Sequence, residues 1–272
     1  MGVKIDGRQL HHLRFADDIV LITPDISLVE RMLADFDKGC GKIGLRLNLK
    51  NTMFMKNGCF VCPIHAQRNE YLRMLQLCVS RSEINVMNDL APELSRRKRA
   101  AWGAVRSIED VVKKTKNIRL LAHHFDSMVL LALTYASEIW SLRNKDERSL
   151  GVFERAVEST MLGVSRFTQV RDGIRSSDLR QRSKIKDAVP YAKQSKIRWA
   201  GHVMRMNDNR WTRAVSDWIP RNVKRTVGRP PTRWSEFFTK SLEERYNARR
   251  VPKASRTHWA TLARDWEKWK IY

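Results

Sequence analysis

The chain has 272 residues, of which 42% are hydrophobic, and this excludes a wholly disordered protein. Its four cysteines exclude a disulfide framework for a chain of this length and favour a reducing compartment. The net charge of +23 predicts a polyanionic partner. Nucleic acid is the first candidate, and an anionic membrane surface or a ribosome are alternatives.

The positive charge is concentrated after the first 57 residues. Residues 1–57 carry nine Lys or Arg and seven Asp or Glu side chains, whereas the remainder carries 43 and 22. The first ten residues contain no apolar signal-peptide core, and an apolar run such as Met128–Leu133 is far too short to cross a bilayer. We therefore expect an intracellular protein, nuclear or cytoplasmic, that has no membrane partner.

Two hairpins are predicted at the start of the chain. Asp6–Gly7 is a turn signal between two short apolar segments. The ten residues Leu13–Ile22 then place apolar side chains on both sides of Asp17 and Asp18. This second pattern predicts a hairpin with the two acids at its tip.

One helix and one strand are predicted next. Ser27 is expected to cap a helix that begins near Leu28 and stops around Gly39–Gly41. The alternation of leucine with polar residues over 45–50 predicts a half-buried strand.

The rest of the chain is predicted to be mostly helical. Residues 57–83 fit neither helical nor strand periodicity. Pro92 stands where a helix should begin, and a break is expected at Pro190. The predicted helices are 93–114, 117–142, 146–163, much of 171–219, 232–247 and 255–270, with a loop over 220–234.

Asp17 and Asp18 are candidates for metal chemistry. Adjacent carboxylates repel each other, and a divalent cation relieves that repulsion. Mg²⁺ prefers such hard oxygen ligands together with substrate phosphates, and a pair of ions can activate a 3′-hydroxyl and stabilise a leaving pyrophosphate. The alternative is a solvated turn without a ligand.

Three segments resemble one protein family. LRFADDIVLI (Leu13–Ile22) resembles the palm hairpin of reverse transcriptases from non-LTR, LINE-like retrotransposons, and GLRLNLKNT (Gly44–Thr52) is similar to the segment that follows it. Farther along, LTYASEIW (Leu133–Trp140) and the stretch Lys196–Trp234 resemble the C-terminal region of nematode-type elements of the RTE clade.

The resemblance implies an α+β fold and an RNA-directed DNA polymerase, a nucleotidyltransferase that uses Mg²⁺ with an RNA template and a DNA primer. Asp17 and Asp18 would be its catalytic metal ligands. Lys50 would lie near the incoming triphosphate, where a cation can neutralise charge, or it is an ordinary exposed lysine. The implied parts are a palm remnant (1–56), an irregular segment that we interpret as a frameshift scar (57–83), a thumb-like helical region (84–145) and a basic helical region (146–272).

The family's polymerase site also uses a third carboxylate on an earlier palm strand. The 272 residues contain no such strand, so we expect this chain by itself to be inactive as a polymerase. A non-catalytic nucleic-acid-binding remnant is the alternative function, and a decayed gene product without function is a third.

Two basic regions are candidates for nucleic-acid binding. The helix 93–114 carries a basic face that could follow a phosphate backbone, or could be a solvated surface. In the tail, arginines alternate with tryptophans, which could stack on unpaired bases or could be packing anchors. The candidate residues are Arg96, Arg97, Lys98, Arg99, Arg106, Lys113, Lys114, Arg198, Arg205, Arg229 and Arg233.

Overall fold

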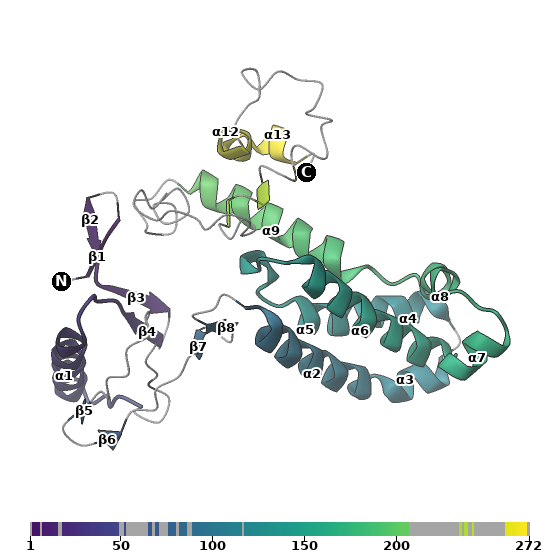
Figure 1. The fold of residues 1–272 in the computed structure, drawn as a ribbon, viewed down its shortest axis with the longest axis horizontal. Coiled ribbons are helices and arrows are strands. Elements are labelled where there is room, and N and C mark those ends of the chain that lie inside the picture. Colours follow the sequence, from purple (N-terminus) through teal and green to yellow (C-terminus); the bar gives the residue numbers. More distant parts are fainter. Residues whose placement is uncertain are drawn as a thin grey trace. The chain divides into compact units, whose positions relative to one another are not determined.

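The structure is a computed structural model that divides into two compact units, one built mainly from residues up to Asp89 and one that begins at Leu90. Short antiparallel hairpins and many helices make it an α+β protein, as predicted (Figure 1). The residues that it describes are 2–5, 7–15, 18–48, 52, 65–66, 69–70, 76–79, 82–85, 89–115, 117–206, 211, 234–235, 237–238, 241 and 259–270.

Both predicted hairpins at the start of the chain are confirmed. Strand β1 (Val3–Ile5) pairs with β2 (Arg8–Leu10) around Gly7, whose φ of 81° is the left-handed conformation that this turn requires. Strand β3 (His12–Phe15) pairs with β4 (Asp18–Leu21), so that Phe15 lies opposite Asp18. The register leaves two residues between these strands.

The helix α1 (Ile26–Lys42) is also present, but its cap differs from the prediction. Asp25, not Ser27, is the N-cap, and its carboxylate accepts hydrogen bonds from the Ser27 amide at 3.2 Å and the Ser27 hydroxyl at 2.8 Å. The strand expected over 45–50 is wrong for its described residues, 45–48. Leu45 is 58% exposed, and leucine alternation makes no strand where no neighbouring strand pairs with it.

Regular structure also occurs within 57–83, where none was predicted. Strand β5 (His65–Ala66) pairs with β6 (Asn69–Glu70), and β7 (Gln76–Val79) pairs with β8 (Ser82–Asn85). Strands this short are defined by backbone pairing across a turn. They need not show the alternation that a half-buried strand shows.

The predicted helix 93–114 is two helices, α2 (Ala91–Ser107) and α3 (Glu109–Lys114), with a break at the buried Ile108. Pro92 lies in the first turn of α2, as expected. The run predicted over 117–142 contains α4 (Ile118–His124), a π-helical turn (Phe125–Val129), α5 (Leu130–Thr134) and a short 3₁₀ turn (Ser137–Ile139). Helix α6 spans Asn144–Leu162, close to its prediction.

The helical predictions over 171–219 and 255–270 need correction, whereas most of the loop predicted over 220–234 and of the helix predicted over 232–247 lies outside the described residues. Helix α9 (Ala188–Arg205) continues through Pro190, because a proline in the first turn lacks only an amide that has no intrahelical partner. The helix expected over 255–270 is interrupted by Asp265, which caps the second of two pieces. The other helices that the described residues form are α7 (Arg166–Arg171), α8 (Ser176–Ser183), α12 (Trp259–Arg264) and α13 (Trp266–Trp269).

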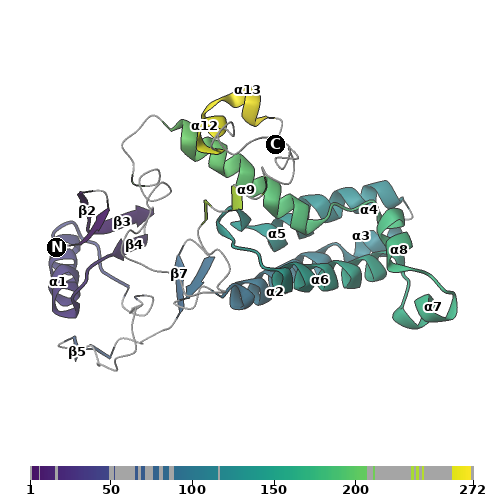
Figure 2. The same cartoon turned by 45° about the horizontal axis from the view of Figure 1, so that its top comes forward.

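Two apolar clusters organise the helical unit. The larger lies among α2, the π-helical turn, α5, α6 and the start of α9, with Phe125, Val129 and Leu150 fully buried. The smaller joins the C-terminal half of α9 to α12 and α13, which lie against it in both views (Figure 1, Figure 2). No helix in the described part of the chain is long and apolar enough to cross a membrane.

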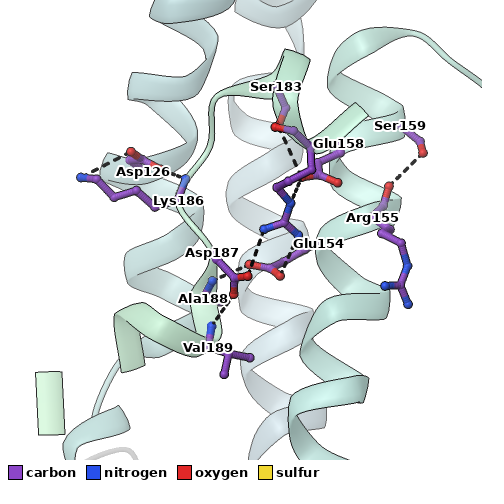
Figure 3. A network of polar contacts seen from close by, with 11 residues as sticks. Asp126, Glu154, Arg155, Glu158, Ser159, Ser183, Lys186, Asp187, Ala188 and Val189 are labelled. Carbon is purple, nitrogen blue, oxygen red and sulfur yellow. Dashed lines mark hydrogen bonds and ion pairs between the residues drawn. The ribbon is translucent and has the colours of Figure 1, made fainter. Parts of the chain in front are cut away.

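A buried polar network fixes α8 and the start of α9 on α6 (Figure 3). Glu154 and Glu158 of α6 are each 1% exposed, and both contact the guanidinium of Arg180, at 3.1 and 2.5 Å. Glu154 also accepts the Ala188 amide at 2.5 Å. Burial raises the pKa of both glutamates, although Arg180 opposes the shift.

Candidate nucleic-acid interface

The acidic pair is only partly described. Asp18 is the first residue of β4, opposite Phe15, which agrees with the predicted hairpin. Asp17 and Lys50 lie outside the described residues. Within the described part of the chain, no three His, Cys, Asp or Glu side chains gather so that they could hold a metal ion. Magnesium binding by Asp17 and Asp18 therefore stays a prediction.

The basic run of α2 divides into buried and exposed members. Glu93, which is 1% exposed, binds Arg96 and Arg97, each with a shortest contact of 2.6 Å. Arg97 is itself 7% exposed, and its guanidinium lies 4.5 Å from the centre of the Tyr135 ring. Arg97 is therefore an interior residue, and it does not belong to a surface that contacts phosphates.

Lys98 also makes a contact within the protein. Its ammonium donates a hydrogen bond to the Ser149 hydroxyl of α6, and burial lowers its pKa, against the attraction of Asp146. By contrast, Arg99, Arg106 and Lys114 are exposed and have no acidic partner among the described residues. Lys113 lies in α3, but only its backbone is described.

Helix α6 runs beside α2 and adds cations that sequence reasoning missed. Lys98 contacts Ser149, and the Trp102 and Phe153 rings pack edge to face at 5.5 Å, one turn farther along both helices. Arg148 and Arg155 of α6 are exposed. They stand singly in the sequence, and only the packing of α6 beside α2 places them on the helix next to the one that carries Arg99 and Arg106. We call the surface formed by Arg99, Arg106, Arg148 and Arg155 the α2–α6 surface.

The tail places its tryptophans in two environments. Trp259 and Trp269 are buried anchors of the smaller cluster, 4% and 5% exposed, as the packing alternative predicted. Trp199 and Trp266 are 38% and 56% exposed. Arg198 and Arg205 lie on α9, whereas Arg229 and Arg233 lie outside the described residues.

Lys196, which was not singled out from the sequence, is buried in the middle of this tail. It is 4% exposed and donates a hydrogen bond to the Trp140 carbonyl at 2.9 Å. Its ammonium lies 4.8 Å from the centre of the Phe237 ring, and burial lowers its pKa to about 8. The sequence did not predict the burial of Lys196, because the aromatic residues that surround it come from distant parts of the chain and meet it only in the fold.

The chain is similar over nearly its whole length to one known protein. No protein-family model and no solved structure matches the chain. A protein of Caenorhabditis elegans, whose name describes it as uncharacterized and transposon-derived, is 32% identical over 278 residues. The match covers 98% of this chain and 96% of the relative. The chain therefore belongs to the family of this transposon-derived protein.

Proposed function

We propose that the protein is a derivative of a non-LTR retrotransposon reverse transcriptase that binds nucleic acid on its α2–α6 surface. The observation that carries this proposal is the exposure of Arg99 and Arg106 on one side of α2, without acidic partners among the described residues. Arg148 and Arg155 add two exposed cations on the neighbouring helix.

The geometry suits a phosphate backbone. Arg99 and Arg106 are seven residues apart, so they project from nearly the same side of α2, about 10 Å apart along its axis. Arginines so placed can contact separate phosphates of one strand, and such contacts give affinity without sequence preference. Trp102 and Lys98 hold α2 against α6, so the surface is formed before the ligand arrives.

The origin from a reverse transcriptase is supported by two independent observations. The segment LRFADDIVLI forms the hairpin β3–β4 that the family resemblance requires. The transposon-derived relative covers nearly the whole chain.

A primer-extension assay with Mg²⁺ tests whether polymerase activity accompanies this origin. We expect no product from the 272-residue chain, because it lacks the family's third carboxylate. Template-dependent product that disappears in Asp17→Ala would show instead that the chain is a polymerase.

Binding is tested by fluorescence anisotropy with a labelled 20-base-pair DNA duplex over a series of salt concentrations. We expect the logarithm of affinity to fall linearly with the logarithm of salt concentration. Arg99→Gln/Arg106→Gln should reduce the slope of this line by about two, one for each lost phosphate contact.

Arg166→Gln/Arg182→Gln is the matched control, because it removes two exposed arginines from α7 and α8. If both double variants reduce the slope equally, the phosphate contacts are not specific to the α2–α6 surface. An absence of binding by the unmodified protein would refute the proposal.

A further inference from the structure

Helix α9 presents a row of aromatic and cationic side chains that the α2–α6 surface does not include. Its members on α9 are Tyr191, Arg198, Trp199, His202 and Arg205, and Trp266 of α13 joins them at one end. We call this row the α9 face. From these side chains we infer that the α9 face binds an unpaired strand of nucleic acid by stacking on its bases. This inference rests on the proposed function and names the form of nucleic acid that this second surface prefers.

The spacing of the row follows from the period of the helix. Tyr191, Arg198 and Arg205 are seven residues apart, so each lies two turns beyond the last and nearly above it. His202 is four residues after Arg198 and lies on the same side. Trp199 lies on one flank of this line.

Contacts between rings and cations join these side chains. The Arg198 guanidinium lies 5.8 Å from the centre of the Tyr191 ring, and the Trp199 and His202 rings are 5.3 Å apart and inclined at 37°. The Arg205 guanidinium lies 4.6 Å from the centre of the Trp266 ring. Arg205 also donates a hydrogen bond to the Ala263 carbonyl at 2.9 Å, which holds its position.

The opposite side of α9 is packed, so the face is held in place. Ala200, Val203 and Met204 are at most 2% exposed and lie in the smaller cluster with Trp259 and Trp269. Burial there leaves Trp199 and Trp266 on the surface at 38% and 56% exposure.

The charge of α9 favours an anion. The helix contains no Asp or Glu between Ala188 and Arg205. Arginines beside flat aromatic rings match a strand whose phosphates alternate with unpaired bases. In a duplex the bases stack on one another, so Trp199 and Trp266 would find no free base there. The aromatic part of the face therefore distinguishes an unpaired strand from a duplex.

The test measures anisotropy of the full chain with 20-nucleotide single-stranded DNA, single-stranded RNA and duplex DNA at one salt concentration. We expect Trp199→Ala/Trp266→Ala to bind both single strands at least about ten-fold more weakly. Its affinity for duplex should change less than about two-fold, because the α2–α6 surface is intact. Trp199→Tyr/Trp266→Tyr keeps two stacking rings and should retain most single-strand affinity.

Phe167→Ala is the control, because Phe167 is 74% exposed on α7, outside both surfaces. The inference is overturned if the double alanine variant binds single strands as the unmodified protein does, or loses duplex affinity equally. It is also overturned if Phe167→Ala has the same effect, or if the unmodified protein shows no preference for single strands. Failure of the unmodified protein to bind any of the three ligands would instead refute the proposed function itself.

Discussion

Gly201 of α9 lies directly beneath the indole of Trp269. A Cβ atom at position 201 would come within 2.4 Å of Cδ1 and Nε1 of that ring and 2.8 Å from an Arg205 nitrogen. The indole is also held in place, since its Nε1 donates a hydrogen bond to the Ile197 carbonyl at 2.9 Å. The absence of a side chain at 201 therefore allows α13 to pack on α9.

Gly201→Ala should destabilise the protein by about 1–3 kcal/mol, because the methyl group forces the Trp269 ring out of the smaller cluster. Gly103→Ala is the control, because a Cβ atom at that helical position meets nothing within 4 Å. It should stabilise the protein by about 0.5–1 kcal/mol through better helix propensity. Thermal unfolding of both variants measures the difference, and a neutral Gly201→Ala would contradict this packing.

Lys196 should make the stability of the protein rise at alkaline pH. Its pKa falls from the ordinary 10.5 to about 8 in the fold, because burial disfavours the charged form. As pH falls, the unfolded chain takes up this proton near pH 10.5 and the folded chain only near pH 8. The contribution of Lys196 to the free energy of unfolding should therefore grow between pH 8 and 10.5, by about 3 kcal/mol at most.

Lys196→Met removes this titration and serves as the reference. Urea unfolding of both proteins at pH 7.5 and 10 measures the effect as the change in their stability difference. That comparison cancels the other lysines and tyrosines, which titrate in both proteins. An unchanged difference would mean that Lys196 does not titrate in the fold as its burial implies.

Glu158 should have the opposite effect on stability: its contribution should fall as pH rises through the acidic range. Burial, and then the neighbouring Glu154, raise its pKa above the ordinary 4.5, against the attraction of Arg180. The folded protein thus takes up this proton at a higher pH than the unfolded chain. The contribution of Glu158 to stability is fully present below pH 4.5 and is lost as pH rises through the folded value. Urea unfolding of the unmodified protein and of Glu158→Gln at pH 7 and pH 5 measures this effect. The stability of the unmodified protein relative to the variant should be higher at pH 5 than at pH 7. An unchanged stability difference would refute the prediction.

Arg97 and Arg99, two residues apart in one basic run, should respond differently to substitution. Arg97→Met takes a cation from the buried Glu93 and should cost about 3 kcal/mol, since a buried charge then loses a partner. Arg99→Gln changes an exposed side chain and should alter stability by less than about 0.5 kcal/mol, while weakening duplex binding. Urea unfolding and anisotropy on both variants separate the two effects, and similar stability losses would show that Arg99 is also structural.

The sequence alone predicted features that depend on neighbouring residues in the chain. The hairpin β3–β4 follows from apolar residues around Asp18, and Pro92 marks the start of α2 because its missing amide costs nothing there. The family resemblance rested on the same kind of local pattern. Helix boundaries were less accurate, because the cap at Asp25 and the breaks at Ile108 and Asp265 depend on short-range hydrogen bonds and burial.

Only the tertiary structure decided which residues of a basic or aromatic run are buried. Arg97 and Arg99 look alike in sequence, yet their directions from α2 differ by about 200°, so one meets Glu93 and Tyr135 in the interior and the other meets water. In the same way, Trp269 packs on Gly201 while Trp266 stays exposed beside Arg205. The composition determined that this protein carries a large positive charge. The packing of α2 on α6, and of α12 and α13 on α9, determined where that charge is displayed, because helix pairing joins residues that are far apart in the chain.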